Sequence, residues 1–206
     1  MLLPRVGRNH SYAWPVLRPG YPIETERLIL RPFEPGDLDD LHAYQSRPDV
    51  ARYLMWDARN RSQAAESLNR KLQQRAISAE GQSLVLAAVH RGTGLVIGEV
   101  MLVWLSREHQ QGEIGFVFNP GYHGQGLAAE AAQVVLALGF GDLALHRIIG
   151  RCDARNRPSA RLMERLGMRR EAHFVHDEIF KGEWGDELVY AMLDHEWRAS
   201  RKAGGQ

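Results

Sequence analysis

One stretch, residues 113–130 (EIGFVFNPGYHGQGLAAE), limits what this chain can fold into. It begins as an apolar, β-prone run, passes through the turn sequence at residues 119–121 and then enters a helical pattern with one apolar face. Gly124 and Gly126 stand where the strand gives way to the helix, and glycine lets a backbone adopt positive φ and approach a ligand closely. Because the first amides of a helix have no internal partner and lie at the positive end of its dipole, this junction predicts a phosphate or pyrophosphate site.

Two well-known glycine loops fit this junction poorly. A nucleotide-binding P-loop needs a Lys-Ser or Lys-Thr pair after its last glycine, and Leu127-Ala128 stands there instead. The dinucleotide fingerprint G-x-G-x-x-A is present at residues 124–129, but residues 119–123 separate it from the strand that it should follow directly. An NAD-linked oxidoreductase therefore stays open only as a weak alternative.

The rest of the chain predicts a mixed sheet. Strands are expected, in chain order, over residues 24–33, 83–89, 95–105, 113–118 and 146–152. Turn sequences at residues 91–94 and 107–112 would join the second, third and fourth of these as antiparallel neighbours. Helices are expected after Asp37, from Ser62 and after Gly126. A length of 206 residues suits one α/β domain with a sizeable core.

Several segments together resemble one family. Residues 122–131 (YHGQGLAAEA) are similar to the pyrophosphate loop of the GNAT superfamily of acetyl-coenzyme A N-acyltransferases, and residues 156–168 (NRPSARLMERLGM) resemble its second signature. Residues 25–33 (TERLILRPF) resemble the first strand of the RimJ/RimL-like branch, which acetylates ribosomal-protein N-termini. Residues 181–190 are similar to the closing hairpin, so the resemblance covers residues 23–197.

The resemblance implies an α/β fold with a mixed, strongly twisted central sheet and helices on both faces. Two parallel strands, residues 113–118 and 146–152, would splay apart at their C-terminal ends and admit the pantetheine arm of the coenzyme. A splayed strand exposes backbone groups that need partners. We expect a proline-rich arm over residues 1–22, a single acetyltransferase domain over residues 23–200 and a tail over residues 201–206.

The implied reaction is acetyl transfer from acetyl-CoA to a primary amine. The positions that match the donor-binding residues of the family are Phe116, Val117, Phe118, Gly121, His123, Gly124, Gln125, Gly126, Leu127, Ala128, Asn156 and Arg165. The superfamily often has Gln or Arg three residues before the first loop glycine, and Gly121 stands there instead. Backbone amides would therefore carry more of the binding.

Three residues are candidates for the chemistry. Glu113 matches the place of the base glutamate, and Ser159 matches a serine thought to assist the leaving thiolate in the RimL-like branch. Many relatives use a tyrosine seven residues after the signature asparagine, but Met163 occupies that position. The amide of Asn156 would hold the pantetheine or the acceptor. Each candidate also suits a plain structural role: a strand-start carboxylate, a helix N-terminal residue or a turn residue.

Composition sets the remaining expectations. With 26 basic and 25 acidic residues, the chain has no strong field that would point to nucleic acid or an anionic membrane as a partner. A single cysteine, Cys152, and no apolar run of signal-peptide or transmembrane length favour the cytoplasm. No metal is expected, and both a monomer and a homodimer remain open. The acceptor also remains open, with an α-amine favoured over polyamines, and a non-catalytic acyl-CoA-binding regulator is a second alternative.

Overall fold

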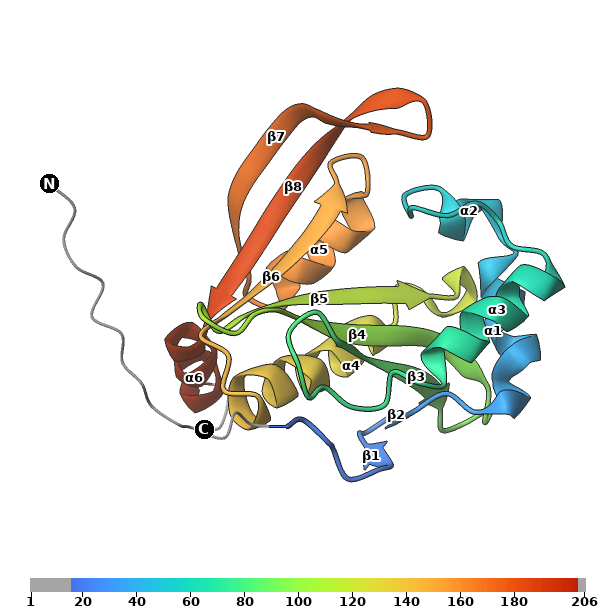
Figure 1. The fold of residues 1–206 in the computed structure, drawn as a ribbon, viewed down its shortest axis with the longest axis horizontal. Helices are drawn as coiled ribbons and strands as arrows, with labels where there is room; N and C mark the ends of the chain where they lie inside the picture. Colours follow the sequence, from blue (N-terminus) through green and yellow to red (C-terminus); the bar gives the residue numbers. More distant parts are fainter. Residues whose placement is uncertain (1–15, 204–206) are drawn as a thin grey trace, which may run out of the picture.

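The computed structural model describes residues 16–203. Its strands are β1 (Ile23–Glu24), β2 (Leu28–Arg31), β3 (Ser83–His90), β4 (Val96–Ser106), β5 (Gln111–Phe118), β6 (Arg147–Asp153), β7 (Arg169–Phe180) and β8 (Glu183–Leu193). Its α-helices are α1 (Leu38–Gln45), α2 (Pro48–Ala51), α3 (Arg61–Lys71), α4 (Leu127–Ala137), α5 (Arg157–Arg165) and α6 (Asp194–Ala203). Short helical turns cover Pro35–Asp37, Pro120–Tyr122 and Leu138–Asp142. The strands form one sheet in the order β1-β2-β3-β4-β5-β6-β8-β7 (Figure 1).

The strand directions confirm the predicted mixed sheet. Strands β3, β4 and β5 pair as consecutive antiparallel neighbours, as the turn sequences predict. Within residues 16–203, β5 and β6 make the only parallel pair. A dinucleotide-binding sheet is built from successive parallel strands with crossover helices. The oxidoreductase alternative therefore fails on topology, although its glycine spacing is present.

The parallel pair is short, and the predicted splay is confirmed. Pairing between β5 and β6 stops at Glu113 and Ile149. Beyond that point β5 continues beside β4 as far as Phe118, while β6 continues beside β8 as far as Asp153. The sheet thus divides into two wings, and β6, β8 and β7 diverge from β5 in Figure 1.

Helices cover both faces of the first wing. Alternate residues of β3 point to opposite faces: Leu84 and Leu86 pack in the cluster that includes α4, and Val85 and Ala87 pack in the cluster that includes α1 and α3. All of these side chains are buried, as the continuous apolar run predicts for a strand covered on both faces.

Helix α5 packs closely on the second wing because β6 carries a glycine. A Cβ atom added at Gly150 would lie 2.6 Å from the sulfur of Met163, so only glycine leaves room for this side chain. Met163 is almost fully buried there. The position that many relatives use for a catalytic tyrosine is therefore part of the core in this chain.

The first and last described segments both belong to packed or regular structure. Leu17 is buried and exchanges two backbone hydrogen bonds with Ile77, at 2.8 and 3.0 Å. The last residues of the expected arm thus take part in the packing of the domain. Helix α6 continues to Ala203, three residues beyond the expected boundary at residue 200. Residues 1–15 and 204–206 lie outside the described residues.

Candidate active site

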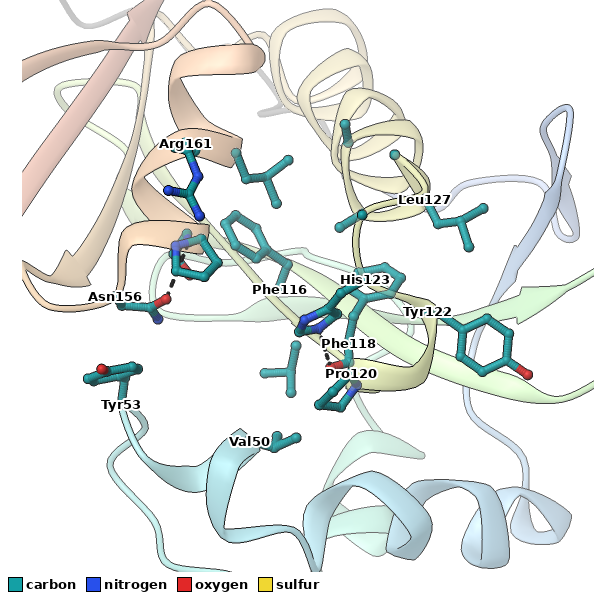
Figure 2. A pocket seen from close by; sticks show the side chains of 18 of the residues that line it. Val50, Tyr53, Phe116, Phe118, Pro120, Tyr122, His123, Leu127, Asn156 and Arg161 are labelled. Carbon is teal, nitrogen blue, oxygen red and sulfur yellow. Dashed lines mark hydrogen bonds between the residues drawn. The ribbon is translucent and has the colours of Figure 1, made fainter.

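A cavity of about 480 Å³ opens where β5 and β6 separate (Figure 2). Its walls come from the end of β5, the loop into α4, the first turns of α5 and the segment around α2. Predicted site residues that line it are Phe116, Val117, Phe118, His123, Gly124, Gly126, Leu127, Ala128, Asn156, Ser159 and Arg165. Residues 113–130 and the second signature thus meet in one place, although 25 residues separate them in the sequence.

The loop into α4 presents free amides to this cavity. Gly124 and Gly126 have φ values of +77° and +80°, a region that disfavours every residue with a side chain at Cβ. Within the described chain, the amides of residues 124–129 donate to no protein acceptor, and the first helical hydrogen bond runs from the Glu130 amide to the Gly126 carbonyl (3.1 Å). A row of unpaired amides at a helix N-terminus is suited to an anion.

Two predicted loop residues do not line the cavity. The Gly121 amide donates to the side-chain oxygen of Asn119 (3.1 Å) and is therefore not available to a ligand. Gln125 directs its carbonyl oxygen away from the cavity, to the guanidinium of Arg27 (2.7 Å). The geometry thus gives no support to Gly121 as a donor-binding residue, because its amide already bonds to Asn119.

The exposed edge of β5 offers backbone groups to the gap. The Asn119 amide bonds to Ile97 on β4, and successive residues of a strand point their amide and carbonyl to alternate sides. The backbone groups of Phe116 and Phe118 therefore face the side that β6 has left. His123 donates from Nε2 to the Phe118 carbonyl (3.0 Å), as the dashed line in Figure 2 shows. This leaves the Phe118 amide and both backbone groups of Phe116 for a ligand.

The first turn of α5 forms the wall of the cavity that faces the exposed edge of β5. Asn156 is its N-cap, and its side-chain oxygen accepts the Ser159 amide (3.3 Å). The nitrogen end of the Asn156 carboxamide keeps its donors for the cavity, where Figure 2 places this side chain. Arg161 and Arg165 add positive charge further along the same helix. Sequence reasoning missed Arg161, although it stands one helical turn before Arg165.

Glu113 does not line the cavity; its side chain lies on the same face of β5 as Val117 and opposite to Phe116 and Phe118. It sits at the last paired position before the splay, with the Arg151 Nε atom 3.8 Å from its carboxylate. Burial raises its pKa above the ordinary value, Arg151 opposes the rise, and the nearby Glu187 adds to it. A carboxyl group with a raised pKa at the edge of the gap is a candidate for proton transfer.

The remaining wall comes from the segment around α2. Asp49, Val50, Tyr53 and Leu54 line the cavity, and Figure 2 shows Val50 and Tyr53 facing β5 and Asn156 across it. Sequence analysis gave no specific role to these residues, because nothing in a four-residue helix marks it as part of a site.

Lys181, in the turn between β7 and β8, holds this wall from the other wing. Its ammonium group donates to the carbonyls of Ala51 (2.9 Å) and Trp56 (3.0 Å), and it pairs with Asp57 (2.9 Å). The distant wing thus helps to define the position of the α2 segment.

The single cysteine is unsuited to covalent catalysis. Burial raises the pKa of Cys152 to about 12, and the carboxylates of Asp153, Glu187 and Glu164 add to the effect. The nucleophile in thiol chemistry is the thiolate, which is scarce at neutral pH with such a pKa. Direct attack by an acceptor on the donor therefore fits this site better than a cysteinyl intermediate.

Comparison with known proteins identifies the family. The model of the acetyltransferase (GNAT) domain matches residues 27–169. The chain belongs to the GNAT acetyltransferase family. It is 37% identical over 175 residues to the uncharacterized N-acetyltransferase YnaD of Bacillus subtilis (strain 168). The matched region covers 85% of this chain and 98% of YnaD.

Two further relatives bear on fold and activity. The crystal structure of a GNAT-family acetyltransferase from Bacillus anthracis superposes with a TM-score of 0.74 and 36% identity, covering 84% of this chain and 99% of that one. The spermidine N(1)-acetyltransferase of Escherichia coli (strain K12) is 25% identical over 177 residues, covering 86% of this chain and 91% of the relative. The protein is an N-acetyltransferase of a family that uses acetyl-CoA as its acyl donor.

Among residues 16–203, no three His, Cys, Asp or Glu side chains are arranged to hold a metal ion. No helix in this part of the chain is long and apolar enough to cross a membrane.

Proposed function

We propose that this acetyltransferase transfers the acetyl group of acetyl-CoA to a primary amine, whose nitrogen attacks the thioester directly. The observation that carries the proposal is the splay of β5 and β6 beside a loop whose amides from Gly124 to Ala129 have no protein acceptor. The pyrophosphate would bind these amides, and the pantetheine arm would run along Phe116 and Phe118 as if it were an added strand. The residues present fit this donor: free backbone donors, an open strand edge and two arginines on α5.

The acceptor would approach from the face of β5 that carries Glu113. A protonated amine has no free electron pair, and at pH 7 an α-amine with pKa ~7.8 is neutral about one time in seven, against about once in a few thousand for a lysine side chain. Glu113 would take the proton, directly or through a water molecule, as the amine nitrogen forms its bond to the thioester carbonyl carbon. Its raised pKa supports this role.

The departing sulfur would be assisted from α5. As the carbon–sulfur bond breaks, the thiolate accepts a hydrogen bond from the Ser159 hydroxyl, and the remaining donors of Asn156 hold the pantetheine or the acceptor. Both side chains line the cavity. Met163 cannot contribute, because it is buried against Gly150. A thiol with pKa ~8.5 is a fair leaving group near neutral pH, so this help is the smaller part of catalysis.

We favour an α-amine, or another amine of modest pKa, over a polyamine. A polycation needs several carboxylates without partners, and those near the α2 wall are paired: Asp49 with Arg47 (2.7 Å) and Asp57 with Lys181 (2.9 Å). At the gap, Glu113 and Glu187 share Arg151, which offsets part of their negative charge. The RimJ/RimL-like resemblance points the same way. The likeness to a spermidine acetyltransferase makes spermidine the competing acceptor.

The test is release of CoA across a panel of amines. Peptides with a free N-terminus should turn over faster than spermidine, and the reverse order would overturn the acceptor class. Acetyl-CoA at ~100 times its dissociation constant should raise the melting temperature by roughly 5–10 °C, whereas NAD should not. Binding without turnover of any amine would make the protein an acyl-CoA-binding regulator instead.

A further inference from the structure

Two residues at the start of the domain contact the loop into α4 from its outer side. Thr25 and Arg27 stand in the turn between β1 and β2, about 100 residues from the loop in the sequence. The catalytic proposal gives them no task, although they belong to the segment that resembles a family strand. Both make short, specific contacts with Glu130 in the first turn of α4.

The contacts form a closed network. The Thr25 hydroxyl (2.6 Å) and the Arg27 amide (2.8 Å) donate to one carboxylate oxygen of Glu130. Nε and Nη2 of Arg27 both lie 2.8 Å from the other oxygen, so this single oxygen accepts two charge-assisted contacts from the guanidinium. Burial acts to raise the pKa of Glu130, but these donors lower it below the ordinary value, so the carboxylate stays charged near neutral pH.

The same guanidinium also sets the direction of a loop peptide. Nη1 of Arg27 donates to the Gln125 carbonyl at 2.7 Å. In a planar trans peptide, this carbonyl and the amide of Gly126 point in opposite directions. Gly126 lines the cavity and Gln125 does not. Holding the carbonyl outside therefore keeps the Gly126 amide directed toward the cavity.

The positive charge beside Glu130 also matters for the anion site. The carboxylate lies one turn from a row of amides suited to an anion, and without a cation beside it a carboxylate would repel a bound pyrophosphate. We propose that Arg27 is a positioning residue for acetyl-CoA binding, which orients the Gln125–Gly126 peptide and compensates the charge of Glu130. Thr25 supports it by holding the same carboxylate. The inference rests on the proposed donor site and adds the residue that keeps it in its binding shape.

The experiment compares Arg27→Met with a matched arginine. Arg91 also holds the turn between β1 and β2, through the Thr25 carbonyl (2.9 Å) and Glu24 (3.3 Å), but touches nothing in the loop. Arg27→Met should raise the KM for acetyl-CoA roughly tenfold while kcat and the KM for the amine stay within about twofold. Arg91→Met should leave all three constants near those of the wild type. Equal KM values for acetyl-CoA in the two variants would overturn the inference.

Two more variants separate the two tasks of Arg27. Arg27→Lys keeps the positive charge but lacks the fork that reaches Gln125 and Glu130 together, so its KM for acetyl-CoA should fall between those of the wild type and Arg27→Met. Adding Glu130→Gln to Arg27→Met removes the uncompensated carboxylate and should recover part of the lost affinity, as a double-mutant cycle measures.

The outcomes keep this inference apart from the proposed function. If the wild type shows no thermal shift with acetyl-CoA, the donor site itself fails. If the wild type binds normally and the cycle shows no coupling between Arg27 and Glu130, only the positioning role fails. If Arg27→Met does not fold, the single variants Arg27→Lys and Glu130→Gln are measured instead. An unchanged KM for acetyl-CoA in both would overturn the positioning role.

Discussion

The loop into α4 and the segment around α2 face each other across the cavity, and they are held in different ways. Most of the shape of the loop is set by its own backbone: two glycines with positive φ, an Asn119 turn and the first turn of a helix, all within a dozen residues. Arg27 holds one of its peptides from outside. The α2 segment contains one four-residue helix and depends on Lys181, 130 residues from Ala51 in the sequence. One wall presents backbone amides, and the other presents side chains.

The difference matches what each wall would bind. A pyrophosphate is the same in every acetyl-CoA molecule, so a fixed row of backbone amides can recognise it. An acceptor amine varies in shape, so its wall is made of replaceable side chains such as Val50 and Tyr53 on a segment with few constraints of its own. Changes in the loop should therefore affect acetyl-CoA, and changes around α2 should affect the amine.

The largest expected effect comes from Gly124→Val. Valine at φ +77° costs backbone strain, and its side chain would occupy the space where backbone and pyrophosphate meet. We expect the KM for acetyl-CoA to rise about 100-fold or more and the thermal shift with acetyl-CoA to disappear. Gly81→Val is the control, because Gly81 has φ +83° and equally open surroundings in a distant turn. A normal thermal shift in Gly124→Val would remove the loop from the donor site.

Glu113→Gln should have the next largest effect, mainly on kcat. Turnover at pH 7 should fall ~10²-fold with little change in the KM for acetyl-CoA, because the base acts on the amine. The deficit should shrink as pH rises toward the pKa of the amine, where solvent supplies the neutral form. Ser159→Ala gives the comparison: it should cost less and show no such trend with pH. Near-full activity of Glu113→Gln at pH 7 would make Glu113 structural.

The same variant has a predictable effect on stability. Burial raises the pKa of Glu113 in the folded state above that in the unfolded chain, so the folded state binds the proton more tightly. Any stability that this proton contributes is present at low pH and is lost as pH rises through the folded pKa. Glu113→Gln, which is neutral throughout, should therefore be at least as stable as the wild type at pH 7. A melting curve at each pH distinguishes loss of the base from loss of the fold.

Sequence signals predicted the loop into α4 much better than the segment around α2. Residues 113–130 carry their structure locally, through a strand pattern, turn residues, glycines and an amphipathic helix. The splay was predicted from the family resemblance, and the register confirms it at Glu113 and Ile149. The roles of Tyr53 and Lys181 were missed, because Tyr53 reaches the cavity and Lys181 reaches Ala51 only through tertiary packing, which no local period encodes. Gly121 was predicted to bind the donor, and the sequence does not show that its amide bonds to the side chain of Asn119.

The smallest expected effect comes from removing the contact between Lys181 and the segment around α2. Lys181→Met keeps the aliphatic part of the side chain but removes the donors to Ala51 and Trp56, so the α2 segment should lose its fixed distance from the β7–β8 turn. We expect the KM for the amine to rise about threefold, with the KM for acetyl-CoA unchanged, since a charged donor to carbonyls is worth more than an exposed ion pair. Asp57→Asn is the matched control: Asp57 is 91% exposed, and its loss should leave both constants unchanged. If Lys181→Met instead raised the KM for acetyl-CoA and spared that for the amine, the two walls could not be assigned separately to donor and acceptor.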